Sequence, residues 1–531
     1  MSGADIDRRT LIGNGIGAAA LALLPRTAYA TPISLQIDAP AGRFLSDGHS
    51  ENGGPRAWSF RGIRYGRAER FRAPTPEPRA TAPVRAVAWG SSSPQAGKGY
   101  AGDANGIPAN EDCLVLNVWT TGKTDKPKPV MFYIHGGAYS SGTGSSALYD
   151  GTQLAERDMV VVTVNHRLNV FGYLYLARLD PRLPDSGNAG QLDLILALQW
   201  VQRNIAAFGG DPSRVMVFGQ SGGGAKIATM TGMPAAKGLF SRAITMSGQQ
   251  VTASGPLNAT TRARAYLGKL GNPSIDALLT MPVEKLIEGL SVPDPILGGA
   301  LYMGPVLDMK WLVRHPFYPD ANPVGLSIPM ILGNCKQETG AFIDPDSATI
   351  KGLTWDNIAE RMAPQLRIDA LPEWVVAEYR QRYPQWSPEQ VMYAATTAGR
   401  SWRGQVIEAE ERAKAGAPAW VYQVDFASRT EPRRGAMHTM DIPLAFGTLG
   451  AAGSQTGTGA DARAASKAVQ DSYVAFARTG DPNHPGLPAW PKYDLARRAT
   501  MIFDTDSRIE DNPRRWQREL FARIPYIQPG T

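Results

Sequence analysis

The chain has 531 residues, 43% of them hydrophobic and 19% charged, which is the composition of an ordinary folded protein with room for a large core. Its formal net charge is +7, but the basic residues are scattered and form no nucleic-acid motif, so nucleic acid is excluded as an expected partner. The two cysteines and six histidines show no spacing typical of metal ligands, and we expect neither a metal nor another cofactor.

The first 30 residues have the pattern of an export signal. Residues 7–12, D-R-R-T-L-I, resemble a twin-arginine motif, a Gly/Ala-rich apolar run follows over 13–24, and Ala28-Tyr29-Ala30 fits a cleavage site. The apolar run is too short to span a bilayer comfortably, so no anchor is expected once the signal is removed. We therefore expect an exported bacterial protein, periplasmic or secreted, whose residues 31–531 form one catalytic domain.

Strands and helices alternate along most of the mature chain. Short apolar runs predict strands at 33–37, 58–63, the apolar end of 111–119, 129–134, 159–165, 215–218, 242–246, 324–333 and 419–426. Helical spacing predicts helices at 191–208 and 513–524, and broken helical excursions over 256–325 and 345–416. Residues 66–110, rich in Pro and Gly, predict an irregular connection. This alternation favours a large, mostly parallel sheet covered by helices on both faces, with the excursions forming its roof.

Ser221 lies where one of these strands meets a helix. The segment V-M-V-F-G-Q-S-G-G-G-A-K-I-A places it between Gly219 and Gly223, directly after the apolar run. A tight strand–Ser–helix turn requires small residues two positions before and after the serine, and it lifts the hydroxyl above the sheet edge. The alternative is a glycine-rich turn with a serine of no special role. The partners described next favour a nucleophile.

A serine hydroxyl needs a base to accept its proton, and only six histidines can supply one. The G-x-S-x-G turn resembles the serine turn of α/β hydrolases, in which the acid follows the serine in sequence and the histidine comes last, and this order excludes the three histidines before Ser221. His315 leaves little chain for a strand and an acid, and His484 lies in a turn with no strand leading into it. His438 follows the strand at 419–426 by a loop, so it is the expected base, with a structural histidine as the alternative.

The acid and the anion-stabilising loop are predicted from the ends of two other strands. Glu338 follows the strand that ends at 333, and Asp344 and Asp346 are rivals further from its end. A buried carboxylate there would fix the imidazole tautomer. The loop His135-Gly136-Gly137-Ala138 follows the strand at 129–134, and its N–H groups, with that of Gly222, could bind a tetrahedral oxyanion.

These residues belong to motifs spread over nearly the whole mature chain. They are F-R-G-I-R-Y, E-D-C-L-V-L-N-V-W, H-G-G-A-Y, V-N-H-R-L, F-G-G-D-P-S-R-V-M-V-F-G-Q-S-G-G, M-S-G, G-N-C-K-Q-E, G-A-M-H and F-A-R-T-G-D-P-N. With them the chain resembles the type-B carboxylesterase (cholinesterase-like) family, which implies the α/β-hydrolase fold. The resemblance assigns the nucleophile, acid and base to Ser221, Glu338 and His438, and the oxyanion hole to Gly137, Ala138 and Gly222.

The resemblance also implies scaffold ion pairs, Glu111 with Arg70 and Arg167 with Asp193. Three further positions depart from the family pattern. Gln220 stands where Glu is usual, which removes a buried negative charge beside the site, and Gly222 stands where Ala is common. Cys113 matches a cysteine that is usually bridged to one upstream, but no upstream cysteine exists here. No match to a choline-binding Trp is found, so a choline ester is not the expected substrate.

The sequence therefore predicts a serine esterase that acts on a small-molecule ester through an acyl-enzyme. Apolar pocket residues are expected among Tyr139, Trp311 and Phe342, with Gln220 beside them. Plain core positions are the alternative for the three aromatic residues. Three arginines before His438 could meet an anionic substrate at the rim, or could line a solvated loop: Arg429, Arg433 and Arg434.

Three other functions stay open at this level. Amide or carbamate cleavage and acyl transfer use the same three side chains, because pocket shape selects the acceptor. A non-catalytic binding module of the same fold would typically lack the nucleophile, which this chain has. No long amphipathic lid typical of an interfacial lipase is evident. The sequence does not indicate the oligomeric state.

Overall fold

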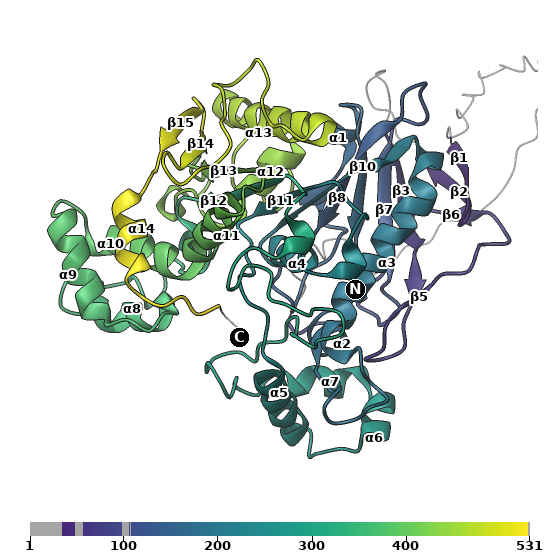
Figure 1. The fold of residues 1–531 in the computed structure, drawn as a ribbon, viewed down its shortest axis with the longest axis horizontal. Coiled ribbons are helices and arrows are strands. Elements are labelled where there is room, and N and C mark those ends of the chain that lie inside the picture. The colour runs from purple at the N-terminus through teal and green to yellow at the C-terminus, as the bar shows by residue number, and fades with distance from the viewer. Residues whose placement is uncertain (1–33, 48–56, 98–105, 107, 529–531) are drawn as a thin grey trace, which may run out of the picture.

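The computed structural model of the chain describes residues 34–47, 57–97, 106 and 108–528. In this part of the chain, 13 strands form one sheet in the order β1-β2-β3-β7-β9-β8-β10-β11-β12-β13-β14-β15, with β6 beside β2 (Figure 1). Its strands are β1 Ser34–Ala39, β2 Gly42–Asp47, β3 Trp58–Arg64, β6 Val84–Arg85, β7 Val115–Thr120, β8 Lys128–Ile134, β9 Val160–Val164, β10 Gly210–Gln220, β11 Arg242–Met246, β12 Met330–Cys335, β13 Ala419–Val424, β14 Ala499–Phe503 and β15 Arg508–Asp511. Two short strands, β4 Gly66–Arg67 and β5 Thr75–Pro76, pair separately.

Helices connect the strands and cover the sheet. The α-helices are α1 Thr152–Ala155, α2 Asn169–Tyr173, α3 Ala189–Asn204, α4 Gly222–Met230, α5 Pro256–Lys269, α6 Ile275–Thr280, α7 Val283–Gly289, α8 Ile358–Leu366, α9 Pro372–Arg382, α10 Pro388–Thr396, α11 Arg403–Lys414, α12 Asp441–Phe446, α13 Ala460–Thr479 and α14 Arg515–Ala522. Shorter 3₁₀ turns include η4 Ile205–Phe208 and η7 Glu338–Ala341, and η8 Thr397–Trp402 is a π-helix.

The centre of the sheet is parallel and its edges are antiparallel. Strands β9, β8, β10, β11, β12, β13 and β14 pair in parallel, whereas β15 and the strands from β7 to β1 pair antiparallel. The carboxyl ends of the parallel strands therefore meet at one edge, where the loops after β8, β10, β12 and β13 can come together. The predicted α/β-hydrolase fold is confirmed.

Strand β8 shows why both faces of the sheet are covered. Its seven residues are all buried, and alternate side chains point to opposite faces. Val130, Phe132 and Ile134 pack in a core cluster with the apolar face of α3. Met131 and Tyr133 pack in a second cluster with α12 and α13. The continuous apolar run in the sequence thus contributes side chains to two hydrophobic cores, one on each face of the sheet.

The predicted excursions form two helical lobes at the edges of the sheet. Helices α8, α9 and α10 lie with α14 at one end of the molecule and share their own core cluster, whereas α5, α6 and α7 lie below the sheet (Figure 1). The lobe of α5–α7 packs on the segment around α2 and on Tyr139, next to the oxyanion loop. The prediction of helical excursions over both stretches is confirmed.

Several predicted elements differ from the structure. The strand predicted over 324–333 starts only at Met330, because Pro323 opens a 3₁₀ turn, η6 Pro323–Gly325. The helix predicted at 191–208 ends at Asn204 and tightens into η4. Strands β2, β14 and β15 and the long helix α13 were not predicted.

The export signal expected at residues 1–30 lies outside the described residues and stays a prediction. Among the helices that the structure describes, none has the length and apolar character needed to cross a bilayer. No three His, Cys, Asp or Glu side chains in the described ranges gather in a way that could hold a metal ion. Both cysteines, Cys113 and Cys335, are buried and unbridged.

Candidate active site

The turn between β10 and α4 has the strained geometry expected of a nucleophile elbow. Ser221 adopts φ 55° and ψ −124°, a backbone region that side chains other than glycine rarely occupy. Its N–H donates to the carbonyl of Met246 at 2.7 Å, which fixes the turn. A Cβ on Gly219 would lie 2.7 Å from the carbonyl carbon of Gly223, and one on Gly223 would lie 2.0 Å from the oxygen of Ile134. The predicted tight turn and its need for glycine on both sides are confirmed.

Glu338 and His438 meet at the ends of β12 and β13. Glu338 is fully buried at the start of η7, and its Oε2 accepts a short hydrogen bond from Nδ1 of His438. Its other oxygen, Oε1, accepts from Ser247 Oγ at 2.7 Å, from the Cys335 N–H at 2.6 Å and from Asn334 Nδ2 at 3.2 Å. These donors hold the carboxylate in place behind the imidazole.

The rival acids and bases have other partners. Asp344 pairs with Arg434 and Asp346 pairs with Arg433, so neither carboxylate faces the imidazole of His438. Of the rival histidines, His315 accepts from the N–H of Ala253 at 3.1 Å, and His484 contacts Ser472 at 3.3 Å.

The Nε2 atom of His438 is held by the residue before the serine. It lies 3.0 Å from Nε2 of Gln220, which donates because Nδ1 of the imidazole already carries the hydrogen given to Glu338. Ser221 Oγ has no hydrogen-bond partner among the described residues. Catalytic hydrogen bonds often tighten only when substrate binds, so the missing contact does not exclude His438 as the base. Gln220, expected beside the substrate, thus contacts the base itself.

The expected oxyanion residues come together in backbone contact. Gly137 and Ala138, after β8, have φ values of 91° and 51°. A Cβ on Gly137 would lie 2.2 Å from the carbonyl oxygen of Ser141, and a Cβ on Gly222 would lie 2.0 Å from that of Ala138. The glycine loop therefore lies directly on the first residue of α4, as a hole lined by backbone N–H groups requires.

Lys226 is a residue of this site that the sequence analysis missed. Its Nζ donates to the carbonyl oxygen of Ala138 at 2.5 Å and lies 5.0 Å from the ring centroid of Tyr139. The side chain is completely buried, and burial lowers the pKa of its ammonium group to about 7. The signal was present in the sequence, because a lysine stands alone in the otherwise small and apolar helix segment G-G-G-A-K-I-A.

The three aromatic residues predicted to line the pocket lie in three different surroundings. Phe342 is 45% exposed and its ring packs on the imidazole of His438, with centroids 4.9 Å apart. Tyr139 is buried, and its hydroxyl donates to Gln250 at 2.8 Å, which places it in the inner wall. Trp311 instead donates its indole N–H to Asp185 at 2.7 Å and packs against the core beside α3, contacts that give its pocket role no support.

The three arginines before His438 are engaged by acidic side chains. Arg429 pairs with Asp461 at 2.7 Å. Arg433 lies 3.2 Å from both Asp346 and Glu389, and Arg434 pairs with Glu431 and Asp344. The solvated-loop interpretation therefore fits them better than contact with an anionic substrate.

The scaffold ion pairs implied by the resemblance are both formed. Arg70 and Glu111 approach to 2.5 Å, and the fully buried pair of Arg167 and Asp193 to 2.6 Å. Arg167 joins the segment after β9 to α3, so this pair supports the wall of the site from behind. Both predicted pairs are confirmed.

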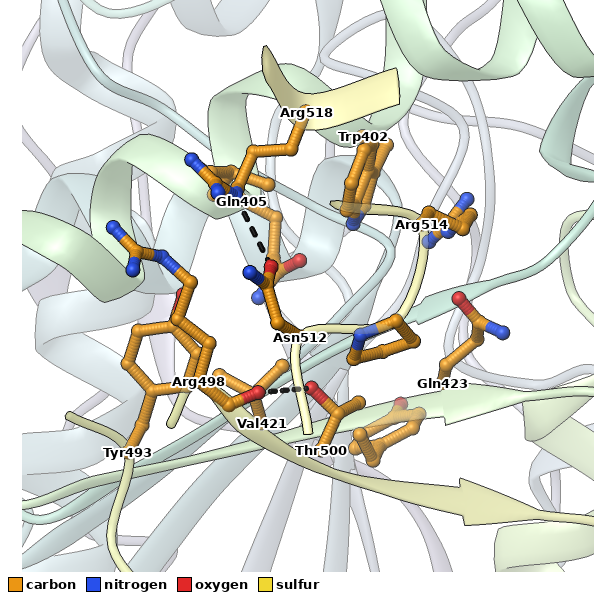
Figure 2. Close-up of a pocket in the computed structure, with 13 residues that line it drawn as sticks. Trp402, Gln405, Val421, Gln423, Tyr493, Arg498, Thr500, Asn512, Arg514 and Arg518 are labelled. Atoms are coloured by element: carbon orange, nitrogen blue, oxygen red, sulfur yellow. Dashed lines mark hydrogen bonds between the residues drawn. The ribbon is translucent and has the colours of Figure 1, made fainter. Parts of the chain in front are cut away.

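A small cavity lies between β13, β14, α11 and α14 (Figure 2). Its volume is about 20 Å³, room for no more than about one water molecule, and Trp402, Arg498 and Asn512 are among its walls. A dashed line in Figure 2 marks the hydrogen bond from Arg518 to Asn512, at 3.2 Å. None of the residues of the candidate active site lines it, so it is not the ester site.

Comparison with known proteins agrees with this geometry. The chain matches the carboxylesterase family over residues 34–521. It is 33% identical to the para-nitrobenzyl esterase of Bacillus subtilis, covering 89% of this chain and 96% of the esterase, and 29% identical to the phenmedipham hydrolase of Pseudarthrobacter oxydans, covering 83% and 90%. A solved carboxylesterase of Geobacillus stearothermophilus superposes with a TM-score of 0.79 at 32% identity, over 92% of this chain and 99% of that one. The chain thus belongs to the carboxylesterase family and is a serine hydrolase of carboxylic esters.

Proposed function

We propose that ester cleavage runs through Ser221, His438 and Glu338 by way of an acyl-enzyme. Ser221 attacks the ester carbonyl while Nε2 of His438 takes the hydroxyl proton and passes it to the leaving alcohol. A water molecule activated by the same nitrogen then releases the acid and restores Ser221. Glu338 keeps Nδ1 of the imidazole protonated and stabilises the imidazolium that forms in both steps.

The observation that carries this proposal is the buried pair of Glu338 and His438 beside the strained turn at Ser221. The pair joins residues 100 positions apart, and three further donors hold the carboxylate. The strained backbone of Ser221 lowers the stability of the fold, and the buried Glu338 carboxylate depends on all of its hydrogen-bond donors. Such features cluster at functional sites. The N–H groups of Gly137, Ala138 and Gly222 are the proposed oxyanion hole, and losing one such donor typically lowers the rate about 10²–10³-fold.

Nε2 of His438 contacts the amide of Gln220, so substrate binding must replace this contact with a hydrogen bond to the hydroxyl of Ser221. Bound ester excludes water and aligns the hydroxyl, so the imidazole gains its catalytic hydrogen bond as the contact with Gln220 lengthens. Because the amide of Gln220 is neutral, this exchange separates no charge.

Hydrolysis of p-nitrophenyl butyrate tests the proposal. We expect Ser221→Ala to lower kcat by about 10⁶-fold, the loss typical of a missing triad nucleophile, and to abolish the initial burst of p-nitrophenol. Mass spectrometry of the quenched wild-type enzyme should show the butyryl adduct on the peptide containing Ser221. Unchanged turnover in Ser221→Ala, or an adduct on a different residue, would reject the assignment.

We also propose that residues 1–30 direct export by the twin-arginine route. The support is the sequence pattern D-R-R-T-L-I followed by an apolar run and an A-x-A site. Replacing Arg8 and Arg9 together by Lys should retain the precursor in the cytoplasm of a bacterial host, as fractionation and immunoblotting would show. Export that is unaffected by this double substitution would contradict the route.

A further inference from the structure

A π-helix packs directly against the loop that carries the acid. Helix η8 interrupts the helical run from α10 to α11, and such wide turns are frequent at functional sites. The hydroxyl of Thr397 accepts from the N–H of Thr339 at 3.2 Å, one residue after Glu338. The carbonyl of Ser401 accepts from Asn334 at 3.2 Å, and the same amide donates to Glu338. The π-helix is therefore part of the wall behind the candidate acid.

Arg400, on this π-helix, lies over the aromatic ring that packs on the candidate base. Its guanidinium carbon lies 4.2 Å from the ring centroid of Phe342, and that ring lies 4.9 Å from the imidazole centroid of His438. Because both contacts share one ring, the guanidinium carbon is no more than about 9 Å from the imidazole centroid, the sum of those separations. The shared Phe342 ring thus places a positive charge within the length of a short ester from the candidate base.

The guanidinium of Arg400 makes no direct contact with an anion in the described residues, and the carboxylate nearest in effect is the buried Glu338. Among the described residues it makes neither an ion pair nor a hydrogen bond, whereas Arg429, Arg433 and Arg434 are all paired. Burial and the nearby charge of Arg367 lower the pKa of Arg400 to about 10, against the attraction of the Glu338 carboxylate, so the guanidinium is still charged at neutral pH. A partly buried guanidinium whose N–H groups bond no anion is costly, and an anion that accepts from those N–H groups would stabilise it.

We propose that Arg400 forms an anion subsite and that the enzyme acts on esters that carry a carboxylate, such as half-esters of short dicarboxylic acids. A guanidinium binds a carboxylate through two parallel hydrogen bonds, and Phe342, 45% exposed, provides an apolar surface for the methylene chain between the two ends. The inference rests on the proposed function, since it assumes that the ester carbonyl is attacked at Ser221.

The test compares two esters of the same shape in wild type and variants. They are p-nitrophenyl hydrogen adipate and the neutral isostere in which an isopropyl group replaces the carboxylate. We expect Arg400→Met to lower the ratio of kcat/KM for the anionic ester to that for the neutral one by about 10–100-fold, the range for a charge-assisted hydrogen bond. Arg400→Lys keeps the charge and should keep part of the ratio. Arg433→Met is the matched control, because it removes a paired arginine near the same loop, and it should leave the ratio unchanged.

Free adipate gives an independent readout. It should inhibit hydrolysis of the neutral ester competitively in the wild type, with an inhibition constant about 10–100-fold weaker in Arg400→Met. If Arg400→Met does not fold, Arg400→Gln takes its place.

The two proposals fail in distinguishable ways. A wild type that cleaves both esters through Ser221 with a ratio that Arg400→Met leaves unchanged would overturn the anion subsite and leave the proposed mechanism standing. Equal losses of the ratio in Arg400→Met and Arg433→Met would also overturn it, because the effect would then be one of general surface charge. A wild type that cleaves p-nitrophenyl butyrate through Ser221 but not the anionic ester would also overturn the anion subsite alone, and loss of the Ser221 adduct with p-nitrophenyl butyrate would overturn the mechanism on which it rests.

Discussion

Replacing Lys226 with Met should change how the stability of the protein depends on pH. The ammonium group has its usual pKa of 10.5 in the unfolded chain and a pKa of about 7 when buried. Between these values the unfolded chain binds a proton that the folded chain lacks, so the free energy of unfolding of the wild type rises with pH. Below pH 7 the full cost of the buried charge is present, and above pH 10.5 it is gone. At about 1.4 kcal/mol for each pKa unit, the whole effect is about 5 kcal/mol.

The titratable side chains that interact with Lys226 have pKa values outside the pH range used to test the lysine. Burial and the lysine charge lower the pKa of His135 to about 3 and that of His166 well below its usual value. Burial raises the pKa of Tyr139 well above its usual value. None of these groups titrates between pH 7 and pH 9.5. The difference between wild type and Lys226→Met therefore reports on the lysine alone, provided that the variant keeps the fold.

Calorimetric melting of both proteins at pH 6.5, 7.5, 8.5 and 9.5 measures the difference. For a chain of this length, 1 kcal/mol shifts Tm by about 1 °C, so the wild type should gain about 3 °C on the variant between pH 7 and pH 9.5. Lys285→Met is the control, because that lysine is exposed and paired with Glu288, and its difference should stay flat. A flat difference for Lys226→Met as well would refute a buried lysine whose pKa lies near 7.

Three further substitutions test the parts of the active site. Gln220→Glu places a carboxylate beside Nε2 of His438 and stabilises the imidazolium. In a plot of kcat/KM against pH, the acidic limb should therefore move to higher pH by about 1–3 units. Gln220→Met adds no charge and should leave the limb at the wild-type pH. Gly222→Ala puts a Cβ 2.0 Å from the carbonyl oxygen of Ala138, so the oxyanion loop must move, and we expect kcat to fall about 10²-fold and Tm to fall as well. Full activity at an unchanged Tm would show that the loop yields without cost. Ser247→Ala removes a donor at 2.7 Å from the buried acid and should lower kcat about 10-fold at unchanged KM; a rise in KM instead would point to a role in substrate binding.

Strands at the centre of the sheet were readable from the sequence because they are buried on both faces. The predicted strand at 242–246 matches β11, and those at 129–134 and 159–165 match β8 and β9 within one residue at each end. Such strands are continuous apolar runs bounded by polar or glycine residues, so their pattern survives any packing around them.

Helix α13 was missed although its pattern is readable, because it buries Val469, Tyr473 and Phe476 at helical spacing. The missed edge strands have weak patterns of their own. Strand β2 buries few apolar side chains, Phe44 among them, and its strand form depends on pairing with β1. At the other edge, β15 has no buried residue and is held by its ladder to β14. Tertiary pairing decided these elements, because local preference was nearly neutral.

By itself, the sequence indicated the candidate nucleophile, acid and base, since the turn at Ser221 and the strand ends before Glu338 and His438 are local patterns. The tertiary structure alone decided what surrounds them. Gln220 contacts His438 across 218 positions, and Lys226 contacts Ala138 across 88. Whether Arg400 meets an acidic residue likewise depends on which segments pack beside its π-helix. The contacts that a side chain makes, or lacks, depend on how segments distant in the sequence pack beside it, and no local sequence pattern encodes that packing.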